Sequence, residues 1–108
     1  MNSKKKYILQ VMVDILPEKE EEWNEWYNQV HIPDILRCPG FLSARRFRAF
    51  QGKGPRYIAI YELEDEKALT TPEFNRARGW YQFASYVIDS RPTVYEEIFS
   101  ANSRSKRL

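Results

Sequence analysis

The order of strand-like and helix-like hydrophobic spacing is the feature that most constrains this chain of 108 residues. Residues 7–16 (YILQVMVDIL) are rich in β-branched and large apolar side chains, whereas Trp23, Trp26, Tyr27 and Val30 recur at the spacing of an amphipathic helix. The predicted elements are, in chain order, a strand over 7–16, a helix over 17–31, strands over 41–50 and 56–63, a helix from Thr71 to before Arg91, and a strand over 93–101. This βαββαβ order predicts an α+β fold of the ferredoxin-like type, in which a four-stranded antiparallel sheet carries both helices on one face.

Prolines and a glycine set the expected ends of the two helices. Pro33 lacks an amide hydrogen and its ring collides with the carbonyl four residues earlier, so the first helix is expected to end or kink near His31. The second helix is expected to begin at Thr71 and to follow an apolar stripe over residues 74–88. Gly79 lies inside that stripe, where it weakens the helix by about 1 kcal/mol relative to alanine and can mark a break.

Length and charge predict a single folded domain over residues 7–101, between basic flexible tails at residues 1–6 and 102–108. Residues 7–103 contain eleven basic and fifteen acidic side chains, a net charge of −4 that repels nucleic-acid phosphates. No apolar run is long enough to span a bilayer, and Cys38 is the only cysteine, so neither a membrane nor an oxidising compartment is expected. We therefore predict a cytoplasmic protein with no nucleic-acid or membrane partner.

The strands also predict a protein partner. Ile8, Met12, Ile58 and Ile60 fall on the faces of the first and third strands that the helices leave open. Soluble monomers rarely expose an apolar patch of several hundred Å², so a second copy of the chain is expected to cover this face. The predicted assembly is a homodimer.

His31 is the only histidine and therefore the only side chain with an ordinary pKa near neutrality. It lies one helical turn after Tyr27, on the same flank of the aromatic stripe. From the residues alone, His31 is either a helix-terminal residue that bonds a backbone carbonyl or a proton-transfer group in a pocket. Asp34 is close enough in sequence to orient the imidazole, although an exposed loop carboxylate is the simpler interpretation.

The second strand carries the candidate cation. Strict alternation places Phe41, Ser43, Arg45 and Phe47 on one face, which we assign to the helix side because it holds both aromatic residues. Arg45 is then a cation inside an apolar pocket, suited to a carboxylate, phenolate or enolate. A salt bridge from Arg45 is an equally good interpretation, and its candidate partners are Glu62, Glu96 and Glu97.

Several chemistries do not fit the sequence. One histidine and one cysteine cannot form a multi-ligand zinc site, and no glycine-rich phosphate loop or serine nucleophile elbow is present. Cys38 has no obvious base beside it, and the third strand lacks the aromatic pattern of RNA-recognition domains. No cofactor and no metal are expected, although haem needs only one histidine and stays open as a ligand.

A family resemblance adds to this interpretation. The stretch EWNEWYNQVHIPDILRCPGFLSARRF combines paired aromatic residues with His31-x-Pro33 and then Pro39-Gly40-Phe41, and it resembles the dimeric α/β-barrel superfamily and, within it, the EthD-like proteins. The later segments PRYIAIYELED and TPEF agree with that superfamily in order and spacing. The resemblance implies two ferredoxin-like protomers whose sheets close into one barrel, with a pocket between sheet and helices in each protomer.

The resemblance also implies a function. The superfamily includes polyketide cyclases, dehydratases, lactone isomerases, cofactor-free monooxygenases and haem-degrading or haem-binding proteins. It places a functional histidine at the position of His31, and we expect Tyr27, Arg45, Tyr61 and Trp80 to contact the substrate, with core packing as the alternative for the three aromatic residues. The sequence thus predicts a cofactor-independent enzyme that acts on an aromatic, polyketide-like or lactone substrate by proton transfer at His31, or else a binding module for a hydrophobic ligand or haem.

Overall fold

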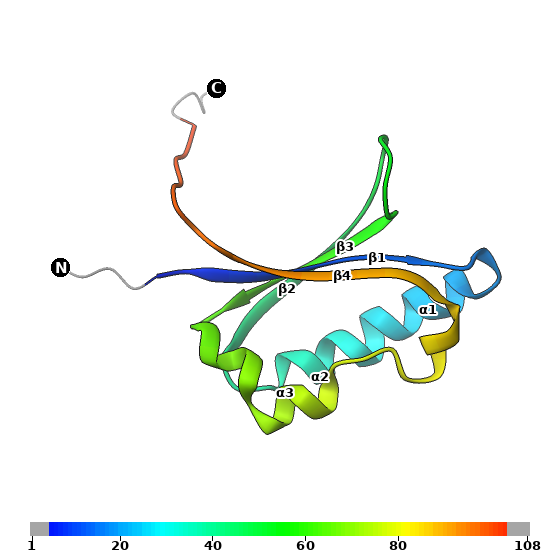
Figure 1. Cartoon of the computed structure of the whole chain (residues 1–108), viewed down its shortest axis with the longest axis horizontal. Helices are drawn as coiled ribbons and strands as arrows, with labels where there is room; N and C mark the ends of the chain where they lie inside the picture. Colours follow the sequence, from blue (N-terminus) through cyan, green and yellow to red (C-terminus); the bar gives the residue numbers. More distant parts are fainter. Residues whose placement is uncertain (1–4, 104–108) are drawn as a thin grey trace.

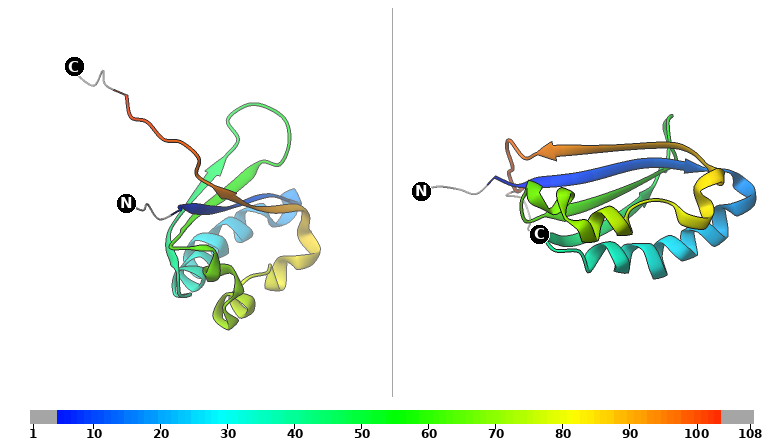
Figure 2. Two further views of the ribbon diagram at one scale, coloured as in Figure 1. Left: turned by 60° about the vertical axis from the view of Figure 1, so that its left-hand side comes forward. Right: turned by 60° about the horizontal axis from the view of Figure 1, so that its bottom comes forward.

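The central strand of the sheet, β1 (Tyr7–Ile15), pairs antiparallel with β3 (Tyr57–Leu63) on one side and with β4 (Val87–Glu96) on the other. β2 (Phe41–Arg48) pairs antiparallel with β3, so the strand order across the sheet is β2-β3-β1-β4. The structure is a computed structural model that describes residues 5–103. All helices cover the same face of the sheet (Figures 1 and 2). The predicted ferredoxin-like fold is therefore confirmed.

The helical layer consists of several short elements. Their bounds are η1 (Pro17–Lys19), α1 (Glu20–Trp26), η2 (Tyr27–His31), α2 (Ile32–Leu36), η3 (Glu66–Thr70), α3 (Pro72–Ala77) and η4 (Tyr81–Tyr86). The Thr71 side chain accepts a hydrogen bond from the Phe74 amide at 3.0 Å, which is the helix cap that the sequence predicted for α3.

Of the two outcomes expected for the first helical segment, an end or a kink near His31, the structure shows no end there but a change of helix type over residues 27–31. The segment continues through α2 to Leu36 by way of η2, a turn of π-helix. There the Ile32 amide donates to the carbonyl of Tyr27, five residues back, and the wider turn relieves the collision between the Pro33 ring and the preceding turn. The proline is thus accommodated by a change of helix type.

The second helical segment is shorter than the apolar stripe suggested. α3 ends at Ala77, and Gly79 has a φ of 112°, a conformation that favours glycine and breaks the helix. The chain then forms a short 3-10 helix, η4, and enters β4 at Val87, six residues earlier than the predicted strand. The predicted strand end at residue 101 is also wrong, because β4 ends at Glu96. The expectations for the tails lie mostly outside the described residues.

A β-bulge changes the faces of β2. Phe41 pairs with Leu63 but Ser43 pairs with Glu62, so Leu42 is an extra residue that shifts the alternation by one position. After the bulge Ala44 and Arg46 face the helices, whereas Ser43, Arg45 and Phe47 face away from them. The assignment of Arg45 to the helix side is therefore wrong.

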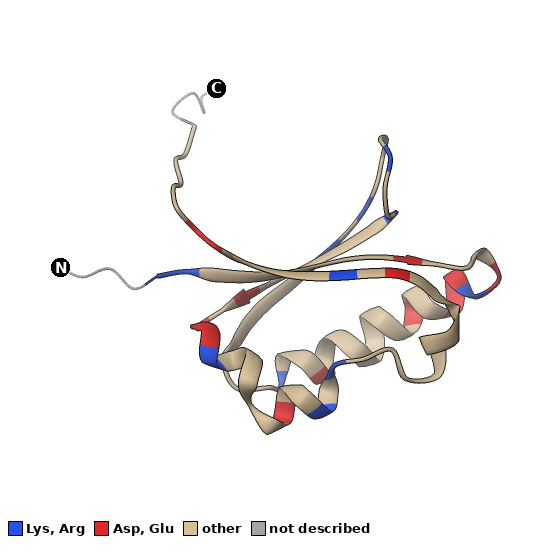
Figure 3. Cartoon of the chain, viewed as in Figure 1, with Lys and Arg blue, Asp and Glu red and all other residues tan. Residues whose placement is uncertain are grey.

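The core lies between the sheet and the helices. On the sheet side it is formed by alternate residues of β1 and β3, among them Val13, Ile15 and Ala59, which are fully buried. Trp23 of α1 is also fully buried and makes edge-to-face contacts with Tyr57, with ring centroids 5.1 Å apart. The opposite face of the sheet has no covering element among the described residues, and no charged side chain lies in the middle of β1 (residues 8–13) or of β3 (residues 57–61), as Figure 3 shows.

Candidate functional site

A cavity of about 470 Å³ lies between the helical layer and strands β1, β3 and β4. Its apolar wall includes Leu9, Val11, Pro92 and Val94 from the sheet and Ile35 and Phe74 from the helices. Its polar or aromatic lining residues are Tyr27, His31, Tyr61, Arg78, Trp80 and Ser90. The volume and the mostly apolar lining are those of a site for a small organic molecule.

The π-helical turn places two of these side chains in the cavity. Tyr27 and His31 are the first and last residues of η2 and its only buried residues. Residues four apart lie on nearly the same side of a helix, so both side chains point toward the sheet. Turns of this type occur frequently at functional sites, and the sequence signal for it is the histidine followed two residues later by proline.

The imidazole of His31 is enclosed by aromatic rings and is only 4% exposed. It stacks on Trp26 with ring centroids 4.7 Å apart, and it meets Tyr27 edge to face at 5.2 Å and Trp80 at 5.6 Å. Its Nδ1 atom is buried and has no hydrogen-bond partner among the described residues. Because the helix continues past it and this nitrogen bonds no carbonyl, His31 does not act as a helix cap.

Burial determines the protonation state of His31. Removal of the imidazole from water lowers its pKa from 6.5 to about 4, an effect that the nearby Asp34 carboxylate only partly opposes. The imidazole is therefore neutral at pH 7. Asp34 does not bond the ring: its carboxylate forms an ion pair with Arg37 at the surface. Asp34 is therefore not the exposed loop carboxylate that was expected, because it lies in α2 and is partly buried.

Tyr27 and Tyr61 form the floor of the cavity. Tyr27 is 1% exposed and Tyr61 is 3% exposed, and their hydroxyls interact with each other. Burial raises the pKa of both hydroxyls above the usual value for tyrosine. Both groups are therefore uncharged hydrogen-bonding groups at pH 7.

Arg46 lies behind Tyr27 and does not line the cavity. Its guanidinium carbon is 4.0 Å from the centre of the Tyr27 ring, and two of its nitrogens donate to the side-chain oxygens of Asn24 and Asn28, each at 2.7 Å. Sequence analysis missed this arrangement, since the bulge that turns Arg46 inward has no distinct signature. The pair Asn24 and Asn28, one helical turn apart, was the available signal.

The structure thus brings four of the five predicted site residues to one cavity: His31, Tyr27, Tyr61 and Trp80. Arg45 is not among them, because it is exposed on the open face of the sheet beside the Phe47 ring. Sequence analysis also missed Arg78, which borders the cavity next to the break at Gly79. Cys38 lies elsewhere, and burial raises the pKa of its thiol, which disfavours a nucleophilic role.

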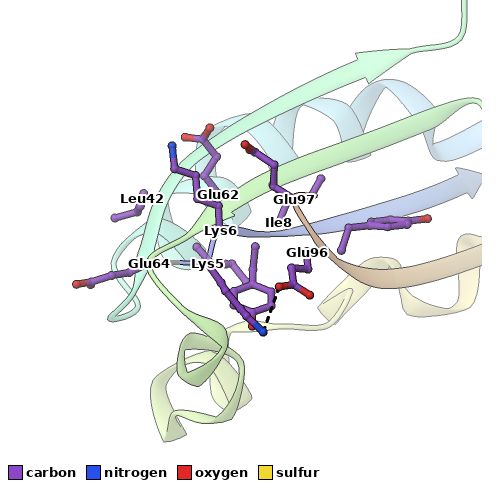
Figure 4. Close-up of a pocket in the computed structure, with 11 residues that line it drawn as sticks. Lys5, Lys6, Ile8, Leu42, Glu62, Glu64, Glu96 and Glu97 are labelled. Atoms are coloured by element: carbon purple, nitrogen blue, oxygen red, sulfur yellow. Dashed lines mark ion pairs between the residues drawn. The ribbon is translucent and has the colours of Figure 1, made fainter. Parts of the chain in front are cut away.

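A second cavity of about 430 Å³ lies at the end of the sheet where β1 begins (Figure 4). Its charged lining is Lys5, Lys6, Glu62, Glu64, Glu96 and Glu97, and the Lys5 ammonium forms an ion pair with Glu96 at 3.4 Å. It contains none of the predicted site residues and no unpartnered buried polar group. The cavity at His31 is therefore the better candidate site.

Fold and cavity together define an α+β protein of the ferredoxin-like type with a cavity between its sheet and its helices. The chain belongs to the family described as domain of unknown function DUF4286, whose profile matches residues 6–100. No curated protein matches the sequence.

Solved structures show the same fold at low sequence identity. The haem degrader MhuD from Mycobacterium tuberculosis, solved with two haems in its active site, is 14% identical, with a TM-score of 0.67 over 89% of this chain and 99% of that one. A protein provisionally named an antibiotic biosynthesis monooxygenase from Nitrosomonas europaea is 13% identical, with a TM-score of 0.66 over 94% of this chain and all of that one. An EthD family protein from Bacillus halodurans is 14% identical, with a TM-score of 0.65 over 88% of this chain and all of that one. The resemblance inferred from the sequence is confirmed.

Two further findings concern the described residues. Within residues 5–103 no helix has the length and apolarity needed to cross a bilayer, and the cytoplasmic location remains a prediction. The same part of the chain holds no group of three or more histidine, cysteine, aspartate or glutamate side chains that is arranged to bind a metal ion.

Proposed function

We propose that this protein is a small-molecule enzyme that binds an aromatic, polyketide-like or lactone substrate in the cavity and uses His31 for proton transfer. The observation that carries the proposal is the neutral imidazole in an apolar cavity, with a buried nitrogen that no described residue bonds. Buried polar atoms in proteins almost always have partners, so an unpartnered one at a cavity suggests a bound molecule.

The simplest reaction is proton abstraction next to a carbonyl group. The C–H proton moves to the imidazole, and the electron pair of that bond moves to the carbonyl oxygen, which becomes an enolate. The uncharged hydroxyls of Tyr27 and Tyr61 line the cavity and can donate a hydrogen bond to the enolate oxygen. The same step can begin a cyclisation, a dehydration, an isomerisation or a cofactor-free oxygenation.

The low pKa of His31 is consistent with this role when the substrate carries negative charge. A base with a pKa of about 4 is weak at pH 7, but an enolate or a carboxylate in the cavity favours the imidazolium and raises that pKa. The arrangement therefore couples basicity to substrate binding. A neutral imidazole at rest also avoids an unpaired buried charge in the empty cavity.

Substitution of His31 tests the proposal. On a substrate found by screening aromatic, polyketide-like and lactone compounds, His31→Gln is expected to lower kcat by about 10²- to 10⁴-fold, the usual contribution of a positioned acid or base. Val30→Ala is the matched control, since Val30 lies on the same turn but is 46% exposed. Near-normal turnover of His31→Gln would contradict the proposed role.

A non-catalytic haem-binding protein is the second candidate, because a neutral imidazole with a free lone pair is what an axial ligand requires. The apolar cavity and the unpartnered nitrogen fit such a group, with His31 as the ligand and the aromatic residues as the wall. Bound haem would supply oxidative chemistry at its iron. An absorbance spectrum after haemin addition separates the two candidates: a shifted Soret band that disappears in His31→Ala supports haem binding.

We further propose that the active form is a homodimer that buries the open face of the sheet. Ile8, Met12, Ile58 and Ile60 are half-buried on this face, and Phe47 beside them is 43% exposed. A second copy buries this apolar surface, which a monomer would leave in water. Sedimentation at micromolar concentration is expected to show a species of twice 12.9 kDa, and a species of 12.9 kDa alone would refute the dimer.

A further inference from the structure

We propose that Arg78 selects ligands that carry an anionic group: the cavity binds an aromatic or apolar acid whose carboxylate pairs with the Arg78 guanidinium at the cavity mouth. The inference rests on the proposed function only in taking the cavity as the ligand site. It does not depend on catalysis at His31.

The charge of the cavity lining is the first argument. Arg78 is the only lining residue that is charged at pH 7, because His31 is neutral and no aspartate or glutamate lines the cavity. A ligand inside this cavity therefore meets one positive charge and no negative charge. The apolar wall excludes water, so a charge in the ligand is favourable only where it can reach Arg78.

The position of Arg78 is the second argument. Its amide donates to the carbonyl of Phe74 at 3.0 Å, which ends α3, and Gly79 with its φ of 112° then turns the chain so that Trp80 also borders the cavity. The backbone of Arg78 is thus fixed at the border of the cavity, while its side chain is exposed and can reach a ligand there. A cation in that place can meet a carboxylate without the cost of full burial.

Within residues 5–103 the guanidinium of Arg78 forms neither an ion pair nor a side-chain hydrogen bond. Arg37, Arg56 and Arg91 are each paired with a carboxylate. Arg76, two residues earlier on α3, borders a different hollow that also contains Asp34 and Glu73. Arg78 is thus available to a ligand, and Arg76 provides a control of the same charge on the same element.

A pair of ligands with equal shape and different charge tests the inference. The probes are naphthalene-2-carboxylate and naphthalene-2-carboxamide, and their binding is measured by the quenching of tryptophan fluorescence at pH 7. A guanidinium and a carboxylate can form two parallel hydrogen bonds, so the carboxylate is expected to bind about tenfold more tightly than the amide. Because the pair is partly exposed, the preference should shrink between about 50 mM and 500 mM salt.

Substitutions identify the source of the preference. Arg78→Gln is expected to bring the two dissociation constants within about twofold of each other, and Arg78→Lys is expected to keep part of the difference, since a lysine retains the charge but not the planar fork. Arg76→Gln is expected to keep the full preference. Equal binding of the two probes to the wild-type chain would overturn the inference, and so would a loss of preference in Arg76→Gln equal to that in Arg78→Gln.

The His31→Gln variant separates this inference from the proposed function. If it keeps the tenfold preference for the carboxylate but turns over substrate normally, the catalytic role fails and the selection by Arg78 stands. If both probes bind equally well to wild type while His31→Gln abolishes turnover, the selection fails and the catalytic role stands. Binding of neither probe would overturn the cavity as a ligand site and the inference with it.

Discussion

The two faces of the sheet use the same strands in different ways. On the helix-covered face, β1 and β3 contribute fully buried side chains such as Val13, Ile15 and Ala59, and the helices add aromatic rings. On the open face the alternate residues of the same strands, among them Ile8 and Ile60, are only half-buried. The comparison shows that one face stabilises the protomer and encloses a cavity, whereas the other leaves apolar residues of β1 and β3 open beside polar residues such as Arg45 of β2 and Arg91 of β4.

The largest expected difference between the faces is in folding stability. Trp23 is fully buried and its ring centroid lies 5.2 Å from that of Tyr27 and 5.1 Å from that of Tyr57, so Trp23→Ala is expected to lower the free energy of unfolding by about 3–5 kcal/mol. Phe47→Ala on the open face is expected to cost less than about 1 kcal/mol at protein concentrations below the dissociation constant of the proposed dimer. Urea titration measures both values. Similar losses would show that the two faces contribute equally to the protomer.

The next prediction concerns pH and belongs to the helix-covered face alone. The pKa of His31 is about 4 in the folded chain and 6.5 as the ordinary value, so the unfolded chain binds the proton more readily. The contribution of His31 to the free energy of unfolding is therefore fully present above about pH 6.5. It decreases as the pH drops toward 4, and the total decrease is about 3 kcal/mol.

The His31→Phe variant isolates this effect. It keeps an aromatic ring in the site but does not titrate, and the carboxylates that wild type and variant share cancel in the difference between their stability curves. Thermal or urea unfolding from pH 7 to pH 4 gives that difference. If the two curves remain parallel, His31 is not a buried neutral base in the folded protein.

Much of this arrangement follows from the sequence, because periodicity and turn residues act locally. The strand order, the hairpin between β2 and β3, the cap at Thr71 and the grouping of Tyr27 with His31 all rest on such local patterns. The wrong predictions concern places where the backbone geometry changes while the spacing of apolar residues in the sequence stays almost the same. One extra residue at Leu42 exchanges the two faces of β2, and a π-turn carries the first helix past Pro33. Arg78 was missed because its role depends on the break at Gly79, which redirects the chain toward the cavity.

Neighbouring arginines on β2 provide the smallest and most direct test of the bulge. Arg46 contacts the Tyr27 ring and donates to Asn24 and Asn28, whereas Arg45 is exposed beside Phe47. Arg46→Ala is expected to lower the free energy of unfolding by about 2 kcal/mol, since it removes two hydrogen bonds from a charged donor, a cation–π contact, and the donor to the partly buried Asn24 oxygen. The loss is not larger, because a half-buried guanidinium whose Nε atom has no partner already carries a desolvation cost.

Arg45→Ala is expected to change stability by less than about 0.5 kcal/mol, as for most exposed side chains. Arg46→Lys is not expected to recover the lost stability. A single ammonium group cannot bond both amides in the way that two nitrogens of the planar guanidinium do. Both substitutions leave the strand pairing intact, so urea titration compares the two side chains directly. The reverse order, with Arg45 contributing more than Arg46, would mean that β2 alternates without a bulge and that Arg45 faces the helices.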